Sequence, residues 1–155
     1  MNTKPELQRA KSDLEKLRDG LIVLSLEDAG AYDLVVDAAR ARKSNPGEPT
    51  EMEYQSALKH ASEVPQKTAL ACLRVLELSF KVASIGTRSA ASDVGVAALL
   101  ADAGLRGAVM NVRINLGDLS DKVFAEAAKS KSDTQESQAS GLVKKVLGEL
   151  SRADS

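Results

Sequence analysis

Apolar residues recur in the N-terminal part of the chain in alternating steps of three and four. Residues spaced in this way fall on one face of a helix, so the pattern predicts a single long helix from Pro5 to about Arg42. Segment 44–49 contains two prolines and a glycine and is predicted to be the loop that ends it. The predicted seam consists of Leu7, Ala10, Leu14, Leu17, Leu21, Leu24, Asp28, Ala31, Val35 and Ala38.

The rest of the chain predicts shorter helices. Thr50 can cap one of them, with Glu53 at capping-box spacing, and Pro65 is expected to interrupt the helical run. Residues 129–140 are rich in Ser and charged side chains, which favours a flexible linker. We therefore expect an all-α bundle of about five to six helices, with a domain over 1–128, the linker, and a short C-terminal helix within 141–155. The predicted helices span 5–42, 50–62, 66–85, 89–116, 118–128 and 142–150.

The composition indicates which residues fill the core and excludes several classes of function. Aromatic residues make up 3% of the chain, and there is no Trp, so Leu, Val and Ala must fill the core. The net charge of −1, without a Lys/Arg cluster, argues against a nucleic-acid partner. No apolar stretch is long enough to span a bilayer, so no membrane role is expected. The only cysteine, Cys72, excludes an internal disulfide and a cysteine-based zinc site. The polar N-terminus lacks the apolar region of a secretory signal, and we expect a cytoplasmic protein.

Asp28 breaks the apolar seam of the first helix. Every other seam member is Leu, Val or Ala, and an unpaired buried carboxylate would be strongly destabilising. Three explanations remain open: Asp28 sets the helix register or pairs with a buried cation, the seam opens to solvent there, or Asp28 lines a ligand pocket.

The helix predicted over 89–116 carries a face of small and polar residues. Its face includes Asp93, Gly104, Gly107, Asn111 and Asn115, so its middle has almost no side chains. Glycine is unfavourable inside a helix, and close approach of another helix is the simplest reason for it. An antiparallel two-fold pairing of this helix would bring Asp93 of one copy toward Asn111 or Asn115 of the other, and this is our hypothesis for a shared site.

Four segments carry a resemblance to a known family. Glu27-Asp28-Ala29-Gly30-Ala31-Tyr32 precedes Ala61-Ser62-Glu63-Val64-Pro65, and the Ser-Asp-Val-Gly run within 86–98 is followed by Asn-Val-x-x-Asn in 111–116. Over about residues 14–128 the chain resembles the cyclodeaminase/methenyltetrahydrofolate cyclohydrolase family. The resemblance departs at Thr87, where the family has Asn. The sequence also does not contain the Gly-rich run and the Gly-Lys segment that the family has upstream of the long helix.

The resemblance implies an all-α homodimer that acts on folate one-carbon units without a metal or redox cofactor. Stand-alone members interconvert 5,10-methenyl- and 10-formyltetrahydrofolate, and the domain fused to formiminotransferase closes 5-formiminotetrahydrofolate and releases ammonia. Carried over, Asp28 or Asp93 would be the catalytic carboxylate, and the substrate-binding positions would be Tyr32, Asn111 and Asn115. The alternatives are a non-catalytic or truncated homodimer that keeps only the scaffold, and an unrelated helical interaction module.

Overall fold

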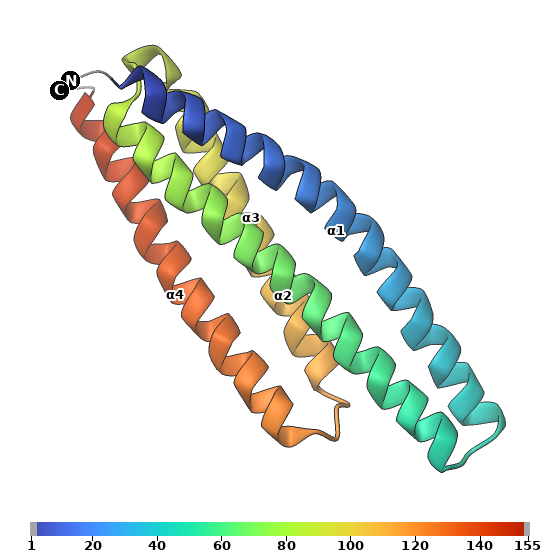
Figure 1. Cartoon of the computed structure of the whole chain (residues 1–155). Coiled ribbons are helices and arrows are strands. Elements are labelled where there is room, and N and C mark those ends of the chain that lie inside the picture. The colour runs from blue at the N-terminus through green and yellow to red at the C-terminus, as the bar shows by residue number, and fades with distance from the viewer. Residues whose placement is uncertain (1–2, 154–155) are drawn as a thin grey trace.

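Four long helices make up most of the part of the chain that the structure, a computed structural model, describes, namely residues 3–153. The helices are α1 (Lys4–Ser44), α2 (Glu48–Ile85), α3 (Ala91–Leu116) and α4 (Lys122–Ala153), with a 3-10 turn, η1 (Arg88–Ala90), before α3. They run up and down in sequence, so that α1 begins and α4 ends at the same end of the molecule (Figure 1). The predicted all-α bundle is confirmed.

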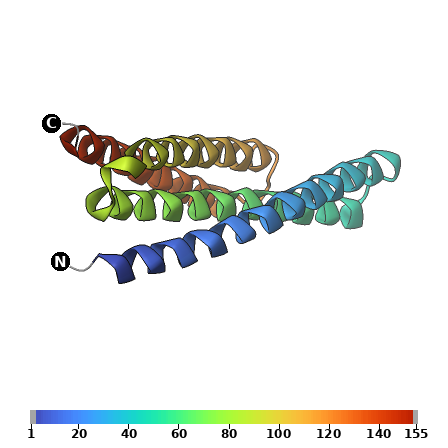
Figure 2. The same ribbon diagram turned by 90° about the horizontal axis from the view of Figure 1, so that it is seen from above.

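The helices are not packed evenly around one axis. The largest core cluster lies between α2, α3 and α4 and is built from residues such as Leu76, Leu105, Val109 and Val146. In contrast, α1 packs on α2 and makes no extended contact with α3 or α4. Figure 2 shows α2 between α1 and the α3–α4 pair. Because α1 is held from one side only, it leaves space between itself and α3.

The α1–α2 contact is made by a narrow seam. Ala10 and Ala31 are the buried residues of α1. Ala31 lies with Ala61 and Val64 of α2 in a small apolar cluster. The small side chains of Ala31 and Ala61 let the two helices approach closely at this point.

The prediction that Pro65 ends a helix is wrong. Pro65 is buried inside α2, which continues through it to Ile85. A proline removes one backbone donor and is unfavourable in a helix, but packing on both sides of α2 holds this helix together.

The predicted flexible linker at 129–140 is also wrong, because this segment lies inside α4. The inward positions Ala128, Ser132, Gln135, Ala139 and Val146 are all buried. They continue one helical seam through the polar stretch, and this seam joins the two short helices predicted on either side into one. The bundle consequently has four long helices rather than five to six.

The loop between α3 and α4 is fixed by polar contacts with α2. The Gln55 side chain donates to the Asp118 carbonyl at 3.1 Å and accepts from the Ser120 backbone N–H at 2.7 Å. Asp121 accepts from the Phe124 backbone N–H at 3.0 Å, which caps the start of α4 and lowers the pKa of Asp121.

Within residues 3–153 no helix is both long and apolar enough to cross a membrane.

Candidate active site

A groove runs between α1 and α3, with α2 as its floor. It consists of two adjoining cavities of about 260 Å³ and about 230 Å³, and both are lined by Asp28 and Asn111. The first cavity also contains Tyr32, Ala61, Ile114 and Asn115. Four of the five residues predicted from the sequence therefore meet in one place.

Asp28 lies where the two cavities join. Its carboxylate is partly buried and makes no hydrogen bond or ion pair with another residue in the described part of the chain. Of the three explanations left open by the sequence, pairing with a buried cation is not found there. Asp28 is partly exposed and lines both cavities, which fits an opening of the seam to solvent and also fits the ligand-pocket explanation.

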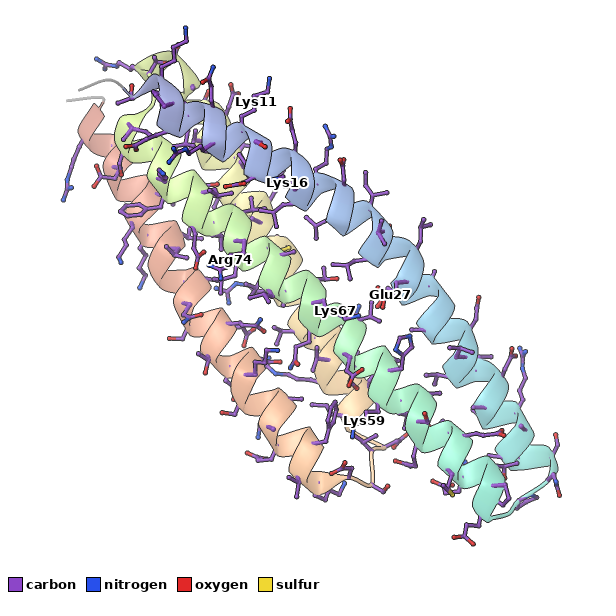
Figure 3. The ribbon with its side chains drawn as sticks, viewed as in Figure 1. Lys11, Lys16, Glu27, Lys59, Lys67 and Arg74 are labelled. Carbon is purple, nitrogen blue, oxygen red and sulfur yellow. The ribbon has the colours of Figure 1, made fainter. Side chains whose placement is uncertain are left out.

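The turn that carries Asp28 is fixed to α2 by an ion pair. Lys67 Nζ lies 2.9 Å from Glu27 Oε1, and Figure 3 shows the two side chains pointing toward one another between the helices. The pair is half exposed, so it contributes little stability on its own, about 0.2–1 kcal/mol. The pair joins this turn of α1, which includes the adjacent Asp28, to α2.

Asn115 is positioned by the proline inside α2. Pro65 has no N–H to donate to the carbonyl of Ala61, four residues earlier, so that carbonyl lacks its helical partner. The Asn115 Nδ2 group fills this vacancy and donates to the Ala61 oxygen at 2.7 Å. As a result, the amide oxygen of Asn115 stays available at a fixed position in the first cavity.

Tyr32 and Asn111 complete the polar part of the groove. Tyr32 is 67% exposed and lies one helical turn after Asp28 on α1. Asn111 lies one turn before Asn115 on α3 and is exposed. Neither side chain has a hydrogen-bond partner within residues 3–153, which leaves both free to contact a ligand from opposite walls.

Asp93 does not belong to this groove. It is exposed in the first turn of α3 and lines neither cavity. Asn111 follows it by 18 residues on the same helix, which corresponds to about 27 Å. A role for Asp93 at the same site therefore requires a second copy of the chain and stays a prediction.

Sequence reasoning missed the roles of Ala61 and Pro65 in this site. The signal was a proline inside an otherwise helical pattern. We interpreted it as the end of a helix and not as a source of a backbone carbonyl without a helical partner.

No cluster of three or more His, Cys, Asp or Glu side chains suited to a metal ion occurs between residues 3 and 153. The groove offers one carboxylate, amides and a phenol, a set suited to proton transfer and to holding a polar ligand.

Comparisons with known proteins agree with one another. The family model described as formiminotransferase-cyclodeaminase matches residues 1–134. A methenyltetrahydrofolate cyclohydrolase from Methylorubrum extorquens is 37% identical over 123 residues, covering 78% of this chain and 59% of the relative. A formimidoyltransferase-cyclodeaminase from Rattus norvegicus is 30% identical over 148 residues, covering 94% of this chain and 26% of that protein.

A solved structure shows the same fold. The crystal structure of formiminotetrahydrofolate cyclodeaminase from Thermotoga maritima matches with a TM-score of 0.87 at 29% identity, covering 97% of this chain and 72% of that one. The chain thus spans less than two thirds of the length of the cyclohydrolase and about a quarter of the length of the two-activity relative.

Proposed function

Because the chain belongs to the formiminotransferase-cyclodeaminase family, we propose that it acts on one-carbon derivatives of tetrahydrofolate. The reaction is either hydrolysis of 5,10-methenyltetrahydrofolate to the 10-formyl compound or closure of 5-formiminotetrahydrofolate with release of ammonia. The observation that carries this proposal is the unpaired Asp28 carboxylate at the centre of the groove.

In the hydrolytic direction, the methenyl carbon is part of a cationic amidinium between N5 and N10. The Asp28 carboxylate stabilises this cation and accepts a proton from the water that adds to the carbon. The tetrahedral adduct then collapses: its hydroxyl group loses its proton as the C=O bond forms, the bond from the carbon to N5 breaks with its electron pair going to N5, N5 takes a proton, and the formyl group stays on N10. In the deaminating direction N10 attacks the formimino carbon and gives up its proton. The former imino nitrogen takes up two protons, and its bond to the carbon breaks to release ammonia and leave the cationic methenyl bridge.

The remaining groove residues bind and orient the substrate. Asn115 presents its amide oxygen from a fixed position, and Asn111 and Tyr32 supply further hydrogen-bonding groups from the two walls. Because the substrate brings its own positive charge and the steps are additions and proton transfers, we propose that no metal or redox cofactor takes part. The folate derivative is the small-molecule partner, and we place the reaction in the cytoplasm.

The working form in this proposal is a homodimer. A stripe of large apolar side chains on α3 packs against no other helix in the described part of the chain. More than half of the surface of each side chain is exposed in Val96, Leu100, Met110 and Ile114. Exposed Ala103 and Gly107 continue it between them. Large exposed apolar surfaces mark interaction sites, and this stripe borders the groove through Ile114 and Gly107. A second copy covering it could supply Asp93 as a further carboxylate.

The first prediction tests this function through Asp28. Purified protein should convert 5,10-methenyltetrahydrofolate, followed by the loss of its absorbance, or release ammonia from 5-formiminotetrahydrofolate. Asp28→Asn should lower kcat by more than about tenfold, because general base catalysis contributes at least that much. The matched control is Asp33→Asn, an exposed carboxylate on α1 that lines neither cavity.

Turnover at the normal rate in the Asp28 variant would remove Asp28 from the mechanism. A parent protein that neither converts nor binds either folate would contradict the proposal and support the scaffold without activity.

A further inference from the structure

The groove consists of two compartments, and neither alone has the size of a usual small-molecule site. Such sites measure about 300–1,000 Å³, whereas the two cavities measure about 260 and 230 Å³. Together they reach the usual range. We therefore expect a folate that reacts beside Asp28 to extend into both cavities.

The two compartments differ in chemistry. The first presents the Tyr32 phenol and the amides of Asn111 and Asn115. The second has more apolar lining, with Leu21, Leu24, Pro65 and Ala108, and its polar residues besides Asp28 and Asn111 at the junction are the hydroxyl-bearing Ser25 and Thr68. Such a groove suits a ligand with hydrogen-bonding groups at one end, a more apolar group at the other, and a positive charge between them beside Asp28.

Gly107 lines the second compartment, and close packing does not explain why it is a glycine. A Cβ atom added at Gly104 would lie 3.2 Å from Cys72 Sγ, and one at Gly95 would lie 3.2 Å from Leu150 Cδ1, so close packing accounts for both glycines. A Cβ at Gly107 would meet nothing within 4 Å. Yet Gly107 is inside α3, where alanine is the more stable choice, and it lines the second cavity. Packing within residues 3–153 thus gives no reason for glycine at this position. The same holds for Gly20, Gly30, Gly141 and Gly148, and Gly107 differs from these four in lining the cavity.

We propose that the second compartment binds the p-aminobenzoyl arm of the folate and that Gly107 is its specificity-determining residue. The pterin then lies in the first compartment. In the substrate, N10 joins the one-carbon bridge to the aryl ring, so the order pterin, cationic bridge, aryl ring matches the order more polar cavity, Asp28, more apolar cavity. This assignment rests on the proposed function and adds the orientation of the substrate to it.

The experiment adds side chains at Gly107. Gly107→Leu should raise KM for 5,10-methenyltetrahydrofolate by more than about tenfold, because the added side chain takes the space of the aryl ring. It should weaken the calorimetric binding of p-aminobenzoylglutamate, and it should leave the binding of a tetrahydropterin without the aryl arm unchanged. Gly148→Leu is the matched control, because Gly148 is an exposed glycine inside α4 that also has nothing within 4 Å of an added Cβ.

A smaller substitution at the same position provides a test if the Gly107→Leu variant does not fold. Gly107→Ala should raise Tm by about 2–4 °C, because alanine favours the helix. Its effect on KM should have the same direction as that of leucine and be smaller. The oligomeric state of each variant is measured by sedimentation in parallel.

The outcomes separate the two proposals. A parent protein that binds no folate overturns the proposed function and this assignment together. A parent that binds, with a Gly107→Leu variant that binds p-aminobenzoylglutamate equally well, overturns the assignment alone. Loss of the dimer in that variant with unchanged fragment binding also overturns it and makes Gly107 a contact between copies.

Discussion

At the scale of single residues, Pro65 links backbone chemistry to the site. The carbonyl of Ala61, which lacks its helical donor, is the acceptor that holds Asn115. A proline that is unfavourable for the helix therefore fixes a group in the groove. Residues that are locally unfavourable for the fold are common at functional sites.

The second prediction concerns this arrangement. Pro65→Ala should raise the free energy of unfolding by about 1–2 kcal/mol, because relief of a penalty of about 3 kcal/mol exceeds the loss of two buried ring carbons at about 0.8 kcal/mol each. The new N–H of residue 65 competes with Asn115 for the Ala61 carbonyl, so KM for the folate should rise. Urea denaturation and steady-state kinetics measure both, and a variant that is less stable with unchanged KM would contradict the account.

Gln135 provides a residue-scale test of the packing of α4. Its side chain is buried, at 4% exposure, and neither amide atom has a hydrogen-bond partner among residues 3–153. A buried amide without partners is destabilising by about 1–3 kcal/mol. The third prediction is that Gln135→Leu raises the free energy of unfolding by about 1–2 kcal/mol, measured by urea denaturation.

The control for this variant is three residues further along the same helix. Gln138 is exposed, and Gln138→Leu should change the stability by no more than about 0.5 kcal/mol. Equal effects of the two substitutions would mean that Gln135 is hydrated or partnered in solution.

At the scale of elements, the sequence predicted the helices where the apolar pattern was strong and failed where polar residues face inward. The three-and-four spacing of the N-terminal seam predicts α1 to within about two residues of its observed end. In α4 the inward positions include Ser132 and Gln135, so the seam could not be distinguished from a solvated linker. The prediction that a helix ends at Pro65 failed for another reason. The hydrogen bond that Pro65 cannot donate to Ala61 is replaced by one from Asn115 of α3, which is distant in sequence.

The contents of the site were partly predictable for the same physical reasons. Asp28 was recognisable as a carboxylate within an apolar seam, and Asn111 and Asn115 as a pair one turn apart. That these residues face one another across α2 depends on how α1 and α3 pack against it, which a single sequence does not specify. The resemblance to a known family, rather than periodicity, connected these residues with Tyr32.

At the scale of the whole molecule, the exposed apolar stripe on α3 predicts self-association. The fourth prediction is that the protein sediments as a dimer at micromolar concentration and that Leu100→Glu makes it a monomer. Leu100 is 68% exposed in the single chain, so a charge there leaves the fold intact but opposes burial of the stripe.

Val123→Glu is the control for this prediction, because Val123 is 83% exposed on α4, outside the stripe. A parent that sediments as a monomer, or a Leu100→Glu variant that remains a dimer, would contradict this assignment.

The attachment of α1 to α2 alone has a consequence for the dynamics of the protein. A helix held from one side can detach without unfolding of the other three, so the free energy of its opening is smaller than that of global unfolding. A ligand that touches α1 and α3 at once binds only the closed arrangement and opposes this detachment by mass action. A ligand in the groove then connects α1 to the rest of the bundle. The frequency with which α1 detaches should therefore fall as the site is filled.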